Sequence, residues 1–266
     1  MHPRFFDIVT FAASRGIKVS TNSNLTLFSR RRAEQCITSG LDTVHVSVDG
    51  SSRETYEKIR VGADWNKVIG NIRLLQNAKK AMAAEHPHIR LVFVLMRMNL
   101  GELPGLVTMA AELGISEIFV QHLCHDFKES TLPVKYRSMQ AFVNDETLLN
   151  EDEAVIENQF ALARAAAAAA GIDLRLPSPR PTERALSSRG RERCDWPWRG
   201  MYLSFDGRSM PCCMIATPDR FNFGSGFEEG AREIWNSARY DEFRSRLESD
   251  DPPDICRSCS VYNGMF

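Results

Sequence analysis

Residues 39–48 read Ser39-Gly40-Leu41-Asp42-Thr43-Val44-His45-Val46-Ser47-Val48, and this stretch sets the pattern from which the fold follows. A glycine ends a helix, because only glycine enters the left-handed backbone conformation without a steric cost, and an apolar strand follows it directly. The same order recurs at residues 15–21 and 113–120. Three glycines that each end a helix and are each followed by a strand predict repeated helix and strand units.

Helices are predicted between these strands from their start signals. Ser29 and Asp64 are N-cap residues, and Ser51 forms a capping box with Glu54. A fourth strand over residues 89–95 follows Pro87. The strands are apolar on both faces, which is typical of a parallel sheet covered by helices. We therefore predict an α/β fold in which parallel strands form part of a (βα) barrel.

The second half of the chain is organised differently. Asn150 is expected to cap an alanine-rich helix over residues 151–170, which Gly171 ends. Residues 174–193 hold three prolines and six arginines, and they are predicted to connect to a smaller unit. The arginines belong either to a solvated linker or to a surface that grips an anionic substrate. In the smaller unit, Asp206-Gly207 turns a hairpin, and a helix is expected over residues 231–247.

Four cysteines form the strongest motif of the smaller unit. Cys194 and Cys212 are separated by a gap that contains Gly207, and Cys256-Arg257-Ser258-Cys259 is a Cys-x-x-Cys pair. Thiolates in this order are metal ligands, and the thiol chemistry alone allows either zinc or an iron–sulfur cluster. We predict that Cys194, Cys212, Cys256 and Cys259 bind the metal. Cys213 duplicates Cys212, but the spacing from Gly207 favours Cys212.

The composition limits the class of protein. The chain has 266 residues, of which 43% are hydrophobic, and a formal net charge of −1, so its overall charge recruits neither nucleic acid nor a membrane. No apolar run approaches the roughly 20 residues of a membrane span, and the N-terminus lacks the apolar stretch of a secretory signal. Seven cysteines, an odd number, indicate reduced thiols rather than a disulfide framework. We expect a cytoplasmic protein.

The C-terminal motifs resemble those of radical S-adenosylmethionine (SAM) enzymes with an auxiliary-cluster domain of the SPASM or twitch type. The resemblance is carried by Cys-x12-Gly-x4-Cys over residues 194–212, by Glu233-Ile234-Trp235-Asn236, by Phe243-Arg244 and by the closing Cys-x-x-Cys. It implies an α+β domain with one auxiliary 4Fe–4S cluster. It also divides the chain into a partial radical SAM barrel at 1–173, a linker at 174–193 and the cluster domain at 194–266.

The strand ends of the first half resemble the third and fourth strands of the radical SAM barrel. The matching stretches are Ser20-Thr21-Asn22, Val46-Ser47-Val48-Asp49-Gly50 and Tyr56-Glu57-Lys58-Ile59-Arg60. The resemblance implies that Asn22, Ser47, Asp49 and Arg60 bind SAM. General principle agrees, since ligands of parallel βα sheets bind at the C-terminal ends of the strands. Taken alone, Asp49-Gly50 is also explained as a helix-capping turn.

Reactive side chains gather at the end of the strand that starts near Ile118. The stretch is His122-Leu123-Cys124-His125-Asp126, and its spacing matches no specific metal template. His122 and Cys124 are weak candidates for catalysis, because a barrel places substrate ligands at this end of its strands. The alternative is a packed strand end followed by a helix cap.

One defining element of the family is absent from this sequence. Radical SAM enzymes hold the SAM-binding cluster with Cys-x-x-x-Cys-x-x-Cys, and residues 1–266 contain no such motif. We expect that the sequence begins late, after two strands and a helix, and that the chain as given is inactive. A misplaced start or a broken gene explains an uncovered strand edge better than an evolved design does.

Three functions remain open from the sequence. The first is a radical SAM oxidoreductase or maturase, acting on a small molecule or peptide, with an electron donor such as flavodoxin or ferredoxin. Its chemistry is hydrogen-atom abstraction by a 5′-deoxyadenosyl radical. The second is a non-catalytic iron–sulfur protein that transfers electrons or binds a partner. The third is a structural zinc unit with four thiolate ligands.

Overall fold

The structure, a computed structural model, describes residues 2–123, 127–180 and 188–264 and divides into two compact units. The first, the barrel unit, comprises residues 1–122 and 150–177; the second, the cluster unit, comprises residues 123–149 and 178–266. Residues 123–149 therefore pack with the C-terminal part of the chain. The domain borders expected from the family motifs rest on a different criterion and stay a prediction.

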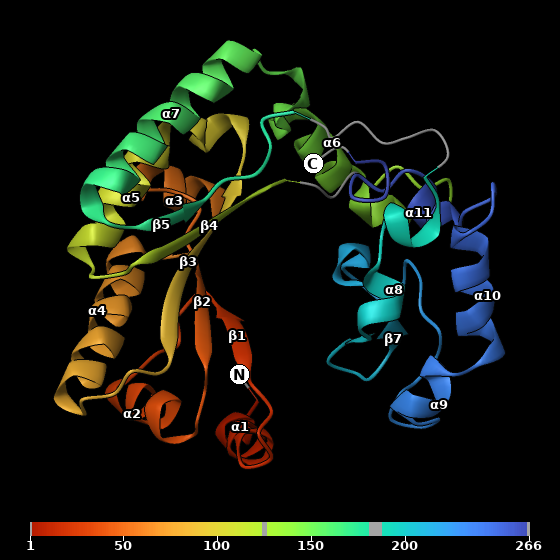
Figure 1. The fold of residues 1–266 in the computed structure, drawn as a ribbon, viewed down its shortest axis with the longest axis horizontal. Helices are drawn as coiled ribbons and strands as arrows, with labels where there is room; N and C mark the ends of the chain where they lie inside the picture. The colour runs from red at the N-terminus through yellow and green to blue at the C-terminus, as the bar shows by residue number, and fades with distance from the viewer. Residues whose placement is uncertain (1, 124–126, 181–187, 265–266) are drawn as a thin grey trace. The chain divides into compact units, whose positions relative to one another are not determined.

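Five parallel strands form the sheet of the barrel unit in the order β1-β2-β3-β4-β5 (Figure 1). They are β1 Ser20–Ser23, β2 Thr43–Ser47, β3 His88–Leu95, β4 Glu117–His122 and β5 Asp173–Arg175. Each strand pairs with the one before it, as repeated βα units require, so the predicted parallel α/β fold is confirmed. The first strand begins at Ser20, later than its apolar run predicted.

Helices cover the sheet on one face, where α2, α4, α5 and α7 lie (Figure 1). The helices of this unit are α1 Phe5–Ala13, α2 Arg30–Thr38, α3 Arg53–Ile59, α4 Trp65–Ala81, α5 Leu103–Glu112, preceded by a 3-10 turn at Arg97–Glu102, and α7 Glu153–Ala170. Ser29 and Asp64 cap α2 and α4, as predicted.

Two predicted caps are wrong by one or two residues. The side chain of Ser52, not Ser51, caps α3, because its hydroxyl accepts the N–H of Thr55 at 3.3 Å. Both serines also donate to the carboxylate of Glu102. Asp152, not Asn150, caps α7 by accepting the N–H of Ala154 at 2.9 Å. Charge explains the second correction, because a carboxylate is a stronger acceptor of backbone N–H groups than a neutral side chain is.

The two faces of the sheet differ in polarity, contrary to the prediction of strands apolar on both faces. Val44, Val46, Leu91 and Phe93 are buried on the face beneath the helices. The alternate residues of the same strands are mostly polar and half-buried or exposed, because successive side chains point to opposite faces. The polar face is the inside of the partial barrel.

The cluster unit is built from short elements. They are α6 Arg137–Glu146, α8 Trp196–Arg199, the antiparallel pair β6 Tyr202–Leu203 and β7 Ser209–Met210, α9 Ala231–Trp235, α10 Ala238–Leu247 and α11 Asp254–Arg257. The helix predicted over 231–247 is interrupted at Ser237, whose hydroxyl caps α10. The core of this unit contains Phe223, Ile234, Tyr240, Phe243, Leu247 and Tyr262.

No helix among the described residues is both long and apolar enough to cross a lipid bilayer.

Gly171 allows a test of the prediction that a glycine ends a helix by entering the left-handed backbone conformation. Its φ is +67°, and a Cβ atom there would meet no neighbouring atom, so conformational strain alone opposes a substitution. We expect Gly171→Ala to lower the free energy of unfolding by about 1 kcal/mol. Gly70→Ala, in the exposed middle of α4, should instead raise it by about 0.5 kcal/mol. Urea titration followed by circular dichroism measures both, and equal effects of the two substitutions would contradict that prediction.

Candidate functional site

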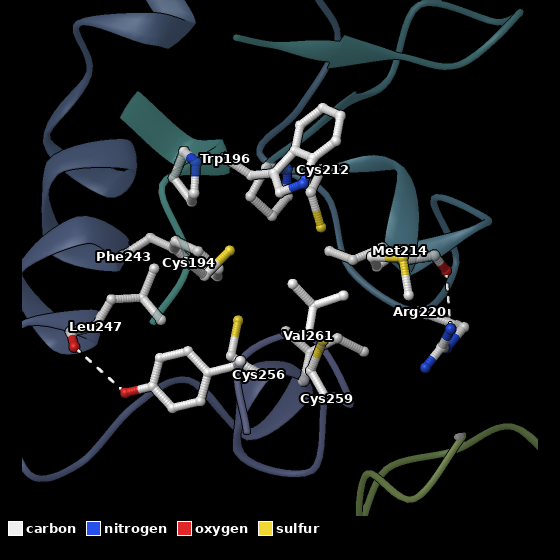
Figure 2. Close-up of a pocket in the computed structure, with 15 residues that line it drawn as sticks. Cys194, Trp196, Cys212, Met214, Arg220, Phe243, Leu247, Cys256, Cys259 and Val261 are labelled. Atoms are coloured by element: carbon white, nitrogen blue, oxygen red, sulfur yellow. Dashed lines mark hydrogen bonds between the residues drawn. The ribbon is translucent and has the colours of Figure 1, made fainter. Parts of the chain in front are cut away.

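Four cysteines from separate elements line one cavity of the cluster unit. Cys194 precedes α8, Cys212 caps a 3-10 turn, Cys256 lies in α11, and Cys259 follows that helix. Their sulfur atoms point toward a common space (Figure 2). Cys213, next to Cys212 in the chain, is not among the residues that line the cavity. The structure thus brings together the four cysteines that the sequence singled out.

Two thiols of this cavity, those of Cys212 and Cys256, resist ionisation. Burial raises the pKa of Cys212 to about 12, and the neighbouring Cys259 and Cys194 add to the effect. Burial also raises the pKa of Cys256 well above its ordinary value, again with help from the other three cysteines. Such thiols lose their protons only when a metal supplies compensating positive charge. The cavity is therefore chemically suited to metal ligation.

Backbone N–H groups single out the sulfur of Cys212. Hydrogen bonds from the backbone of Met214 and Ile215 lower its pKa, against the effect of burial. For Cys213, the pKa is raised by burial, and no neighbouring cysteine contributes. The turn after Cys212 therefore holds this sulfur in place and distinguishes it from Cys213.

The walls of the cavity are apolar. Phe243, Leu247, Ile255 and Val261 lie around the thiols, and Trp196 closes one side (Figure 2). An apolar shell excludes water and governs the reduction potential of a bound metal centre. Phe205, another aromatic residue near the motif in sequence, is 98% exposed and takes no part.

A buried ion pair joins the cavity to a distant stretch of sequence. Arg220 lines the cavity, and its Nε donates to Oε1 of Glu129 at 2.5 Å. The side chains are only 4% and 2% exposed, and the ring of Phe127 lies 4.5 Å from the guanidinium carbon. The sequence does not predict this pair, since nothing in the local pattern around residue 129 marks a buried glutamate.

Further hydrogen bonds hold the same stretch to the cluster unit. Ser130 donates its N–H and hydroxyl to Asp254, the first residue of α11, which carries Cys256. Tyr136 hydrogen-bonds to Thr217 and Asp219, and Lys135 pairs with Asp219. The hydrogen bond from Lys135 lowers the pKa of Asp219 to about 2. Residues 127–136 thus support two of the segments that carry the thiols.

The arginines before Cys194 make contacts within the cluster unit, and the two predicted alternatives for their role, a solvated linker and a grip on an anionic substrate, stay predictions. Arg189 pairs with Asp250, Arg191 lies over the ring of Trp198, and Arg193 lies over the ring of Tyr262. Residues 181–187, with Arg184, lie outside the described part of the chain. The described arginines at 189–193 therefore anchor the chain as it enters the cluster cavity.

A second cavity, of about 390 Å³, opens on the polar face of the barrel unit. It is lined by Asn22, His45, Ser47, Arg60, Arg90, Val92, Val94, Phe119, Gln121 and Arg175. The strand register explains why these side chains share one face of the sheet. Asn22, His45 and Arg90 are directly paired across three neighbouring strands, and Glu117 continues the row on the fourth. Asn22, Ser47 and Arg60, three of the four predicted SAM ligands, meet in this cavity.

The cations of this cavity are partly neutralised. Arg90 donates to Glu117 at 2.8 Å, and Arg175 donates to Asp173 at 3.2 Å. Burial, with Arg90 as a second cause, lowers the pKa of His45. The imidazole is therefore neutral at pH 7, and the cavity offers directed hydrogen bonds rather than a large positive field.

Asp49, the fourth predicted SAM ligand, lies behind the cavity wall. It is 3% exposed, its Oδ1 accepts the N–H of Val94 at 2.9 Å, and its Oδ2 pairs with Arg60 at 2.6 Å. Nε of Arg60 is buried and has no hydrogen-bond partner among the described residues. Asp49 thus fixes the guanidinium of Arg60, a residue that lines the cavity.

The weak catalytic candidates gain no support from this geometry. His122 is 4% exposed and belongs to the helix-covered face of β4, because the cavity residues Phe119 and Gln121 occupy the alternate positions. Cys124 lies outside the described residues.

Within the described part of the chain, no three His, Cys, Asp or Glu side chains close around one point as the ligands of a single metal ion do. An iron–sulfur cubane is larger, because each of its cysteines binds a different iron atom, and its ligands line a cavity. The four cysteines share with such ligands that they line one cavity.

Comparison with known proteins identifies the family. Residues 194–260 match the model of the SPASM iron–sulfur cluster-binding domain, and residues 1–87 match that of the radical SAM superfamily. This chain is a radical SAM protein with a C-terminal SPASM domain. The cofactors of that family are 4Fe–4S clusters and SAM.

Two curated relatives match this radical SAM protein over nearly its whole length. A tungsten-containing aldehyde ferredoxin oxidoreductase cofactor-modifying protein of Pyrococcus furiosus is 24% identical over 279 residues, covering 98% of this chain and 70% of the relative. An AdoMet-dependent heme synthase of Methanosarcina barkeri is 22% identical, covering 97% of this chain and 70% of the relative.

Solved structures confirm the radical SAM fold. Streptococcus suis SuiB superposes with a TM-score of 0.63 at 14% identity, covering 97% of this chain, which spans 57% of SuiB. The enzyme anSMEcpe, with AdoMet and a peptide bound, gives a TM-score of 0.60 at 14% identity, covering 94% of this chain and 65% of its own.

The residues present fit one of the family's clusters. Four thiols in an apolar cavity fit the auxiliary cluster. Residues 1–266 contain no Cys-x-x-x-Cys-x-x-Cys, so the SAM-binding cluster has no ligand set within this sequence.

The Glu129–Arg220 pair yields a stability prediction. Glu129→Gln leaves the buried guanidinium without a counter-charge, and we expect the free energy of unfolding to fall by about 3 kcal/mol. Asp250→Asn is the matched control, because Asp250 pairs with Arg189 but is 83% exposed, and its loss should cost less than about 1 kcal/mol. Chemical denaturation of both variants measures the difference, and similar costs would show that the buried pair contributes nothing special.

Proposed function

We propose that this chain is an oxidoreductase or maturase of the radical SAM class. SAM supplies the 5′-deoxyadenosyl radical that abstracts a hydrogen atom from the substrate, and the auxiliary cluster takes up or relays an electron. The observation that carries the proposal is the convergence of Cys194, Cys212, Cys256 and Cys259 on one apolar cavity. Four thiolates occupy every iron of a cubane, which suits electron transfer rather than substrate binding.

In the barrel unit, we assign the binding of SAM to the polar cavity. Asn22 and Ser47 offer an amide and a hydroxyl for ribose or amino-acid groups. Arg60 lines the cavity and offers a guanidinium, suited to a carboxylate, while Asp49 fixes this group from behind. The role of Asp49 is thus positioning rather than contact.

The proposed substrate is a peptide or a small molecule such as an enzyme cofactor. The Pyrococcus relative is named for cofactor modification and the Methanosarcina relative for heme synthesis, whereas SuiB has been solved with its precursor peptide SuiA. These names support both substrate classes.

We also propose a flavodoxin or ferredoxin as electron donor and the cytoplasm as compartment, where thiols stay reduced.

A second function has one specific observation in its favour. Since the sequence holds no ligand set for the SAM-binding cluster, a protein that only transfers electrons through its auxiliary cluster is compatible with the same cavity. The structural zinc alternative is weaker, because the matching SPASM family binds an iron–sulfur cluster.

Reconstitution tests the assignment of the cluster. After anaerobic incubation with iron and sulfide, the chain should hold about four of each and show visible absorbance that dithionite bleaches. Cys194→Ser, Cys212→Ser, Cys256→Ser and Cys259→Ser should each lose most of this absorbance. Cys213→Ser is the matched control and should keep it. Stoichiometric zinc without sulfide would contradict the proposal.

Binding measurements test the assignment of the SAM cavity. We expect Ser47→Ala and Arg60→Ala each to weaken SAM binding by about tenfold, because each removes a hydrogen bond to a polar or charged ligand group. Equilibrium dialysis with labelled SAM gives the affinities. Arg31→Ala, an exposed arginine in α2, serves as control. Unchanged affinity in both cavity variants would exclude this cavity as the SAM site.

A further inference from the structure

The proposed SAM ligands occupy only one end of the polar cavity, since they lie on β1, on β2 and at the end of α3. The strands β4 and β5 line the same cavity with Phe119, Gln121 and Arg175, which have no role in that proposal. Ser47 on β2 and Arg175 on β5 belong to one row of paired residues that crosses four strands. Three strand spacings, about 14 Å along the sheet, separate them. The cavity therefore has a second end, formed by β4 and β5.

Arg175 is the most accessible of the arginines that line the cavity. Its side chain is 59% exposed, against 28% for Arg60 and 26% for Arg90. Its Nε and Nη2 both donate to a single oxygen of Asp173, at 3.3 and 3.2 Å. Charge-assisted hydrogen bonds are normally shorter, about 2.7–2.9 Å, and a carboxylate that binds a guanidinium well uses both of its oxygens. Asp173 therefore leaves the guanidinium open to a better acceptor.

The charges around Arg175 favour a ligand with one negative charge. Arg90 pairs with Glu117, and Glu117 is the cross-strand neighbour of Asp173. The two arginines balance the two carboxylates, so a singly charged group meets less repulsion here than a doubly charged phosphate does. The planar guanidinium presents two parallel N–H groups, which match the two oxygens of a carboxylate. The chemistry of this end of the cavity thus suits a carboxylate.

An apolar surface lies beside the guanidinium. Phe119 is directly paired with Arg175 across β4 and β5, lines the cavity and is 36% exposed. Val92 pairs with Phe119 from the other side and also lines the cavity. A ligand whose carboxylate reaches Arg175 can therefore place an apolar body against Phe119, where aromatic rings pack well.

We propose that the β4–β5 end of the polar cavity binds the substrate, and that this substrate carries a carboxylate on an apolar, ring-like body. Arg175 binds the carboxylate in place of Asp173, and Phe119 packs against the ring. This inference rests on the proposed function, since it names the substrate class of the cavity that binds SAM. It also gives a role to one arginine of residues 174–193, for which a grip on an anionic substrate was one of the two predictions.

The test is a fluorine NMR titration of the full chain with 4-fluorobenzoate, for which 4-fluorobenzamide is the neutral control ligand. The wild-type chain should bind the benzoate about tenfold more tightly than the benzamide, because only the benzoate forms a charge-assisted pair with Arg175. Arg175→Gln should lower the affinity for the benzoate by about tenfold and leave the affinity for the benzamide unchanged. Arg31→Gln is the matched control, since this exposed arginine does not line the cavity, and it should change neither affinity.

Two further variants act in different directions. Asp173→Asn removes the carboxylate that competes for Arg175, so the affinity for the benzoate should rise by about two- to fivefold. Phe119→Ala removes apolar surface alone, so it should weaken the binding of both probes by a similar factor, about fivefold. A benzoate affinity that Arg175→Gln leaves unchanged, or that Asp173→Asn fails to raise, would overturn the inference.

Saturating SAM separates the two ends of the cavity. SAM should leave the affinity for the benzoate unchanged, because the proposed SAM ligands lie on β1, β2 and α3. Displacement of the benzoate by SAM, or loss of its binding in Arg60→Ala but not in Arg175→Gln, would overturn the inference and leave the proposed function intact. A wild-type chain that binds neither SAM nor an iron–sulfur cluster would instead overturn the proposed function itself.

Discussion

The cluster unit depends on the burial of four thiols in an apolar cavity. Cys194, Cys256 and Cys259 pack against the same buried aromatic cluster that forms the core of this unit, so the ligands belong to the core rather than to a surface loop. Without metal they are small apolar groups held as neutral thiols. With metal they become thiolates, whose bonds tie three segments of the chain together. Cluster binding and folding are therefore the same free-energy event in this unit, as in other small metal domains.

The barrel unit differs from the cluster unit, because its strands carry polar side chains that face a cavity while their other face is buried. Successive side chains of a strand point to opposite faces, and the strand register aligns these faces across the sheet. A row of paired residues from Asn22 to Glu117 crosses four strands on the polar face, while valines and leucines fill the helix-covered face. Each described arginine of the cavity has a carboxylate partner. The cavity therefore orients a ligand by directed hydrogen bonds, and Asp49 holds the guanidinium of Arg60 in place for this role.

The sequence predicted the parts of this structure that are governed by local chemistry. Glycine stops, N-cap side chains and the cysteine spacing located the helices, the strands and the four thiols. It did not predict interactions between residues far apart in the chain. Glu102 accepts hydrogen bonds from Ser51 and Ser52 across about 50 residues of sequence, Asp49 turns inward to hold Arg60, and Arg220 pairs with Glu129 across 91 residues. His45 and Arg90 indicated that one face of the strands is polar. The apolar neighbours of these residues in the sequence favoured instead the prediction of strands apolar on both faces.

Each of the two units is built from two separate stretches of sequence. After β4 the chain contributes residues 123–149 to the cluster unit, returns for α7 and β5, and enters the cluster unit again at residue 178. A fragment that starts at Cys194 keeps all four thiols but loses Glu129, and the buried Arg220 then lacks its counter-charge beside the cavity. Burial of an unpaired charge is far more costly than loss of a surface contact. The ligand motif is contiguous in the family pattern, but the structure that makes it a stable cavity is not contiguous in sequence.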